Sequence, residues 1–87
     1  SVLGEYQIAD QLPGEIPFFE KFSLTESDGL LILSFAQVSN GQKIQMVLET
    51  INDNRAKVAG VGRYAGQSVS IQNDGLKAFG LTLKKAN

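Results

Sequence analysis

Hydrophobic and polar residues alternate along short stretches of this chain, and turn residues separate the stretches at intervals of roughly ten residues. The clearest breaks are Asp28-Gly29, Asn40-Gly41, residues 52–54, Ala65-Gly66 and Asp74-Gly75. Alternation with a period of two is typical of strands that bury one face, and Asp-Gly and Asn-Gly pairs favour tight hairpins. The pattern therefore predicts consecutive antiparallel strands and no helix.

Seven strands are predicted, over residues 2–8, 18–25, 30–36, 42–50, 55–64, 67–73 and 76–85. In the second of them, alternation places Phe18, Glu20 and Phe22 on one face. Sequential hairpins give an up-and-down meander, and strongly twisted strands of this number curl into a barrel that removes exposed sheet edges. We expect a single all-β domain over residues 1–87, folded as a closed or nearly closed small barrel of lipocalin-like shape.

Two places depart from the regular pattern. Residues 9–17 contain Pro13-Gly14 and Pro17, a spacing that no helix survives, so they form the longest predicted loop. The strand over 30–36 is apolar on both faces, which is typical of a strand covered on both sides. Its cover would come from the 9–17 loop, a neighbouring domain or a second copy of the chain. Long loops often bind partners, so these two places are the first candidates for function.

The charges are few but unevenly placed. The formal net charge of −1 gives no reason to expect nucleic acid as a partner. Most acidic residues lie in residues 1–50, whereas most basic residues lie in residues 51–87. Either the two halves pack together with complementary surface charges, or an acidic face and a basic face dock on different partners.

Several kinds of chemistry are disfavoured by residues that the sequence lacks. The chain has no cysteine and no histidine, which removes disulfides and thiolate nucleophiles and argues against a transition-metal site. No serine is followed by lysine three residues later, so the Ser-x-x-Lys arrangement is absent from it. We therefore predict no catalytic residue, no metal and no cofactor. A carboxylate pair such as Glu20 with Glu49 stays open as a minor alternative.

Other segments offer only weak signals. The longest apolar run, residues 30–33, is too short to span a bilayer. The glycine-rich residues 60–68 have neither phosphate-loop nor dinucleotide spacing, and we interpret their glycines as points where a strand bends. An aromatic residue beside an arginine, as in Arg63-Tyr64, can recognise a carboxylate or a ring, although such a pair is more often a core aromatic next to a solvated charge.

Three segments together are similar to a known family. They are Leu3-Gly4-Glu5-Tyr6-Gln7, then Asp28-Gly29-Leu30-Leu31-Ile32-Leu33, and residues 60–69 running on to Asp74-Gly75-Leu76-Lys77-Ala78-Phe79-Gly80-Leu81-Thr82-Leu83. This order resembles the small β-barrel domain at the C-terminus of bacterial serine hydrolases of the penicillin-binding and class C β-lactamase-like group. The resemblance implies a lipocalin-like, catalytically inert barrel, with the nucleophilic serine in a separate domain. The chain differs from that family in having seven predicted strands instead of eight.

The expected function is that of a non-catalytic accessory barrel, which packs on or regulates a serine hydrolase domain. The alternative is a free-standing small barrel that binds an apolar or amphipathic small ligand. Expected partners are therefore another protein domain, a second copy or a small apolar ligand, with no nucleic acid and no membrane span. The compartment stays open between periplasmic, secreted and cytoplasmic. The predicted contact residues are Phe18, Phe19, Leu31, Leu33, Phe35, Arg63 and Tyr64.

Overall fold

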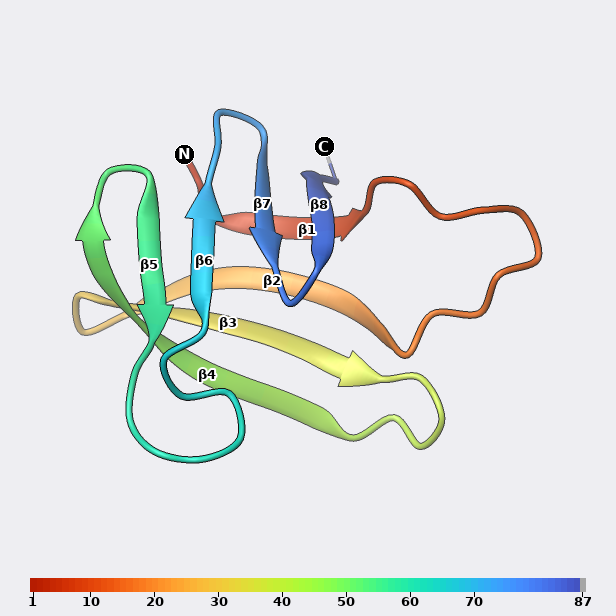
Figure 1. Cartoon of the computed structure of the whole chain (residues 1–87), viewed down its shortest axis with the longest axis horizontal. Helices are drawn as coiled ribbons and strands as arrows, with labels where there is room; N and C mark the ends of the chain where they lie inside the picture. Colours follow the sequence, from red (N-terminus) through yellow and green to blue (C-terminus); the bar gives the residue numbers. More distant parts are fainter. Residues whose placement is uncertain (87) are drawn as a thin grey trace.

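Eight strands form one closed antiparallel barrel in the computed structural model, which describes residues 1–86 (Figure 1). Each strand pairs with the next along the chain, and the last pairs with the first, so that Gln7 lies opposite Lys84. The predicted all-β meander is confirmed and the barrel is closed, but the predicted number of seven strands is wrong. The strands are β1 (Gly4–Ile8), β2 (Phe19–Ser27), β3 (Leu30–Gln37), β4 (Lys43–Asn52), β5 (Arg55–Val58), β6 (Ser68–Ile71), β7 (Gly75–Ala78) and β8 (Leu81–Lys85).

The extra strand arises from a turn that the sequence hides. Residues 76–85, predicted as one strand, form the hairpin of β7 and β8, in which Ala78 lies opposite Leu81. The two residues between them, Phe79 and Gly80, have φ angles of 54° and 74°. Left-handed conformations at both turn positions are typical of a tight type I′ hairpin. Because phenylalanine rarely adopts this conformation, the pattern of the sequence does not reveal the turn.

The strand predicted over 55–64 is also shorter than expected. It ends at Val58 in β5, and residues 59–67 form a loop that leads to β6. Gly60 has a φ of 86°, which lies outside the extended region and turns the chain away from β4. The glycines of this segment therefore end a strand, whereas the sequence pattern predicted that they bend one.

A bulge in β2 changes which residues face the core. The pairing of β2 with β3 shifts between Glu20 and Ser23, and Lys21 has a φ of 57°. One extra residue on a strand inverts the alternation on either side of it. As a result Phe19 packs on the core, whereas Phe18 is 84% exposed. The prediction that Phe18 and Glu20 share a face with Phe22 is therefore wrong.

The turn predicted at Asp74-Gly75 lies slightly earlier. Residues 72–74 make the connection, and Gly75 is the first residue of β7. A Cβ atom at Gly75 would stand 2.4 Å from the carbonyl oxygen of Leu83, which is far inside van der Waals contact. Gly75 is therefore required for the close approach of β7 to β8, and its role is not that of a turn residue.

Inward-facing apolar side chains from all eight strands fill the barrel. Leu24, Leu33 and Leu76 have no exposed surface at all. Alternate positions of each strand supply this core, among them Met46 and Leu48 of β4, with Ile44 packed against them. The buried residues are Tyr6, Phe22, Leu24, Leu33, Phe35, Met46, Leu48, Ala56, Val58, Val69, Leu76, Ala78 and Leu83.

The apolar outer face of β3 finds its neighbours within the same sheet. Ile32 lies between Thr25 of β2 and Val47 of β4, and its side chain is half-buried. Ser34 is only 5% exposed although it points away from the core, and its hydroxyl accepts a hydrogen bond of 3.3 Å from the Gln45 side chain. Adjacent strands therefore shield much of this face.

Candidate functional site

The loop between β1 and β2 is the most prominent feature of the surface. Residues 9–18 extend away from the barrel, at the right of Figure 1. Three large apolar side chains in this loop face solvent: Leu12 is 64% exposed, Ile16 is 80% exposed and Phe18 is 84% exposed. Single exposed apolar residues are common, but three in one loop indicate a contact surface. We call residues 9–18 the docking loop.

Hydrogen bonds hold the docking loop in a defined shape. Its first residue, Ala9, donates to the carbonyl of Thr82 at 2.9 Å, and its last, Phe18, accepts from the Val38 amide at 2.9 Å. Within the loop, the Glu15 amide donates to the carbonyl of Leu12 at 3.1 Å, which closes a turn over Pro13-Gly14. The apolar side chains are therefore presented from a folded turn anchored at both ends.

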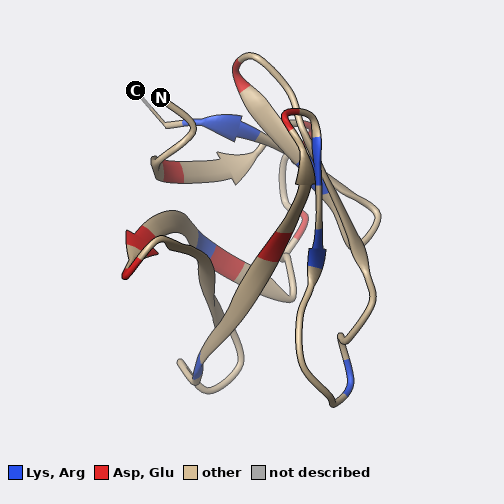
Figure 2. Ribbon diagram, turned by 90° about the vertical axis from the view of Figure 1, so that its left-hand side faces the viewer, with Lys and Arg blue, Asp and Glu red and all other residues tan. Residues whose placement is uncertain are grey.

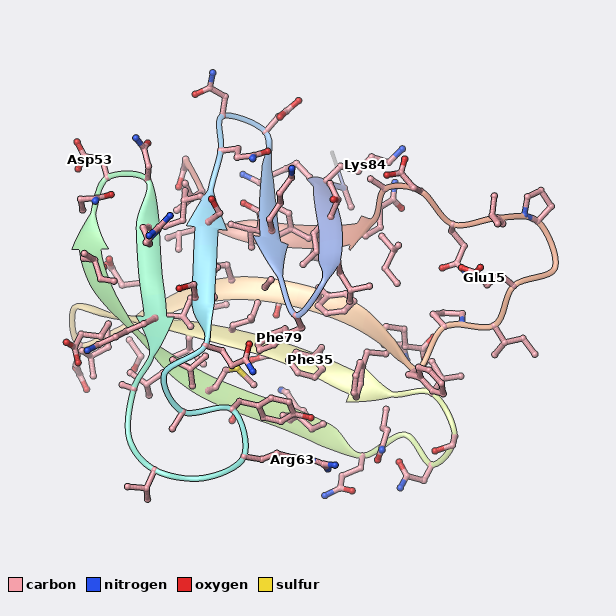
Figure 3. The ribbon with its side chains drawn as sticks, in the orientation of Figure 1. Glu15, Phe35, Asp53, Arg63, Phe79 and Lys84 are labelled. Atoms are coloured by element: carbon pink, nitrogen blue, oxygen red, sulfur yellow. The ribbon has the colours of Figure 1, made fainter. Side chains whose placement is uncertain are left out.

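The loop also carries acidic groups. Asp10 and Glu15 are exposed on it, and Figure 3 labels Glu15 on the projecting segment. The side-chain amide of Gln11 donates to the backbone carbonyl of Glu15 at 2.9 Å. The docking loop thus combines an apolar tip with negative charge, which suits a partner surface that offers both an apolar depression and a basic group.

Three of the predicted contact residues belong to one aromatic cluster at an end of the barrel. The Phe35 ring lies 5.0 Å from that of Phe19 and 6.1 Å from that of Phe79, while Tyr64 and Phe79 are 5.4 Å apart. Figure 3 shows Phe35 and Phe79 pointing toward one another. The rings come from β2, β3, the 59–67 loop and the β7–β8 turn, so tertiary packing alone assembles the cluster.

The predicted contact residues have very different exposures. Leu33 and Phe35 are 0% and 2% exposed, and Leu31 packs against the core, so these three serve the interior of the barrel. Phe19 and Tyr64 are half-buried in the aromatic cluster. Phe18 and Arg63 are exposed, and they are therefore the two that a partner reaches without any rearrangement. Their role as contacts stays a prediction.

A groove on the outer surface, lined by both polar and apolar residues, was not foreseen from the sequence. It has a volume of about 740 Å³ and crosses strands β1 to β4. Small residues, among them Ser23, Ser34 and Ala36, form part of its lining and leave it hollow. Its charged residues are Glu5, Lys21 and Lys43. The sequence gives little signal for it, because the residues come from separate strands and none stands out alone.

The charged residues are spread over the barrel (Figure 2), and their side chains form few pairs within residues 1–86. Within residues 1–86, the one ion pair joins Lys57 to Glu49 at 3.7 Å, and both side chains are largely exposed. Such a pair contributes at most about 1 kcal/mol, so complementary charges do not hold the two halves together. Glu20 of β2 lies opposite Ala36 of β3, which in turn lies opposite Lys43 of β4. Lys43 is six residues before Glu49 on β4. At about 3.3 Å per residue this places the two carboxylates roughly 20 Å apart, so they do not form a pair.

In the part of the chain that the structure describes, no three side chains of His, Cys, Asp or Glu gather closely enough to hold a metal ion. No helix over those residues is long and apolar enough to cross a membrane.

Comparison of the chain with protein-family models, with curated proteins and with solved structures finds no match.

Proposed function

We propose that this barrel is a non-catalytic accessory domain that packs on, and regulates, a catalytic domain of the penicillin-binding and class C β-lactamase-like serine hydrolases. The observation that carries the proposal is the docking loop, whose Leu12, Ile16 and Phe18 are held in solvent by a folded turn. Burying one such side chain against a partner is worth about 1.5–3 kcal/mol. Together the three side chains contribute about 4.5–9 kcal/mol toward association, from which the entropy lost on binding is subtracted.

The fold supports the same proposal. The resemblance implies an eight-stranded barrel, and the apparent shortage of one strand in the sequence is removed by the β7–β8 hairpin. The inert role that the resemblance implies also agrees with an interior built from apolar side chains. The serine hydrolase partner is assigned from the resemblance.

The alternative, a lipocalin-like binder of small apolar ligands, is not favoured by the interior. Leu24, Leu33, Leu76 and Val69 are each 0% exposed and occupy the space that an internal ligand would need. A ligand site on this barrel would have to lie on the outside, where the 740 Å³ groove is lined by both charged and apolar residues.

The first test is the coding sequence of the natural gene. The proposal expects a segment encoding Ser-x-x-Lys upstream of Ser1, or in an adjacent gene of the same operon. If neither place encodes such a motif, the hydrolase assignment is wrong. If one does, the encoded catalytic domain is purified and titrated with the barrel by calorimetry.

The second test uses the docking loop itself. Leu12→Ser, Ile16→Ser and Phe18→Ser combined should weaken association more than tenfold, because each removes about 1.5 kcal/mol or more of apolar burial. The matched control combines Leu30→Ser, Ile51→Ser and Val61→Ser, which are 50%, 53% and 99% exposed but lie elsewhere. The control should bind as the unaltered barrel does. Equal weakening by both triple variants would show that the docking loop is not the contact surface.

A further inference from the structure

The first half of β4 has no partner strand along one of its two edges. Residues from Lys43 to Leu48 pair with β3 on one side, but pairing with β5 begins only at Leu48, opposite Val58. Toward the start of β4, one more hydrogen bond continues the ladder: the amide of Ala59 donates to the carbonyl of Val47 at 2.9 Å. The segment of residues 43–47, which we call the open edge, therefore pairs on one side over most of its length.

The direction of the free backbone groups follows from antiparallel geometry. In such a strand the N–H and C=O of one residue point to the same side, and the next residue points to the other side. Because the Val47 carbonyl faces β5, the backbone groups of Gln45 and Lys43 face the same way. Over residues 1–86 the structure shows no backbone hydrogen bond to either residue on that side. A row of such groups is a template for another strand.

The 59–67 loop explains why the chain itself does not fill this place. If β5 had continued as the sequence predicts, Val61 would have stood opposite Gln45. Instead Gly60, with a φ of 86°, turns the loop outward, and Val61 is 99% exposed. The loop then forms hydrogen bonds within itself and to β5. For example, the Gly66 amide donates to the carbonyl of Val58 at 2.9 Å.

A cleft of about 340 Å³ lies between the open edge and this loop. Val58, Tyr64 and Ala65 contribute to its lining, so it can accept an apolar side chain. Arg63 also lines it, and Figure 3 shows this side chain extending from the loop. Lys43 stands at the beginning of the open edge, and the residues that line the cleft include no acidic one.

We propose that the open edge binds an extended acidic peptide segment of a partner protein, which adds to the barrel as a further strand beside β4. Main-chain hydrogen bonds to Gln45 and Lys43 would supply the pairing, and the cleft would take an alternate apolar side chain. Lys43 and Arg63 favour acidic residues in that segment over basic ones. This proposal does not depend on the docking loop or on a hydrolase partner.

The test measures binding of the peptide acetyl-Thr-Glu-Val-Asp-Val-Thr-amide to the barrel by amide-resolved NMR titration. We expect saturable shifts of the amides in residues 43–47 and 59–65. The matched peptide acetyl-Thr-Lys-Val-Lys-Val-Thr-amide should bind at least about tenfold more weakly, and the preference should shrink at high salt. Equal binding of the two peptides, or no saturable shift at the open edge, would overturn the proposal.

A pair of variants at one position separates strand addition from side-chain contact. Gln45→Pro removes an N–H that faces the open edge, so the β3–β4 ladder keeps its hydrogen bonds while the added strand loses one. Gln45→Ala removes the same side chain, including its bond to Ser34, but keeps the N–H. We expect Gln45→Pro to lower the affinity for the acidic peptide at least about tenfold. Gln45→Ala should keep this affinity within about twofold of that of the unaltered barrel.

Two further measurements keep the result decisive. If Gln45→Pro fails to fold by circular dichroism, Lys43→Glu replaces it, and this variant should abolish the preference for the acidic peptide over the basic one. Sedimentation of the unaltered chain tests the other occupant, a second copy. A dimer that Gln45→Pro dissociates would assign the open edge to self-association and overturn the peptide proposal. The triple variant of the docking loop should bind the peptide normally, which keeps the two proposals separable.

Discussion

The rings of Tyr64 and Phe79 meet edge to face, with centroids 5.4 Å apart and planes inclined at 68°. Phe79 makes this contact from a turn position with a φ of 54°, where phenylalanine is strained. The same ring lies 6.1 Å from that of Phe35, so it joins the 59–67 loop to the barrel wall. The chain therefore has an aromatic residue where glycine would have less backbone strain, because the ring of Phe79 covers one end of the core.

Strain and packing at Phe79 can be measured separately. Phe79→Ala removes the ring but keeps a side chain in the left-handed region, whereas Phe79→Gly removes both the ring and the strain. We expect Phe79→Ala to lower the free energy of unfolding by about 2–4 kcal/mol, with Phe79→Gly less damaging by up to about 1 kcal/mol. Urea denaturation gives both values. It is followed by far-UV circular dichroism, because the chain contains no tryptophan for fluorescence. A glycine variant clearly less stable than the alanine variant would argue against backbone strain at this turn.

Gly75 tests the close approach of β7 to β8. A methyl group at this position would meet the Leu83 carbonyl oxygen at 2.4 Å, so Gly75→Ala must separate two paired strands. We expect a loss of more than about 2 kcal/mol in the free energy of unfolding. Gly29→Ala is the matched control, since it has open space around its Cβ position and meets only the strain of a φ of 79°, worth about 1 kcal/mol. Similar losses in both variants would mean that the strands yield easily.

The bulge at Lys21 allows a stabilising substitution. Lys21 is exposed and has a φ of 57°, which favours a residue without a side chain. Lys21→Gly should therefore leave the free energy of unfolding unchanged or raise it by up to about 1 kcal/mol, since relief of strain competes with the extra freedom of the unfolded chain. A β-branched residue cannot adopt this conformation readily, so Lys21→Val should cost more than about 1 kcal/mol. Thermal unfolding of the three proteins in parallel gives the order.

The accuracy of the sequence-based prediction depended on how local each signal was. Asp28-Gly29 lies in a left-handed turn, as its composition predicted, and period-two alternation predicted the all-β meander. The prediction failed where a residue adopts a conformation that its type disfavours. Lys21 and Phe79 both have positive φ, and together they inverted one face of β2 and hid one strand. Tertiary packing stabilises those two conformations, and packing is not visible in a local pattern.

The candidate surfaces divide in the same way. A loop over residues 9–17 was predicted from Pro13-Gly14 and Pro17, because prolines at that spacing exclude regular structure, whereas Phe18 was assigned to the following strand. The outer groove and the open edge were not predicted. The groove depends on which strands become neighbours, and the open edge depends on where the pairing of β4 with β5 ends. For the open edge one local signal existed in retrospect. Gly60 and Gly62 both have positive φ, and a strand that contains two such residues cannot continue its pairing.

The last prediction concerns Tyr6 and the stability of the barrel at high pH. Tyr6 is 4% exposed, and its hydroxyl donates a hydrogen bond of 2.5 Å to the carbonyl of Val2. Burial raises the pKa of this phenol above its ordinary value of 10.0, because the charged phenolate loses solvation. At a pH above that ordinary value, the unfolded chain releases the Tyr6 proton while the folded chain retains it. The free energy of unfolding must therefore fall as the pH rises through this range.

The matched control is Tyr6→Phe, which keeps the ring and removes the titrating group. This variant should be less stable than the unaltered chain near neutral pH, by about 1 kcal/mol, because it lacks the bond to Val2. Above pH 10 the gap between the two proteins should narrow, since only the unaltered chain loses stability through Tyr6. Urea denaturation of both proteins between neutral pH and the alkaline limit of folding measures the gap. A gap that stays constant across that range would show that the Tyr6 phenol ionises equally well in the folded and unfolded states.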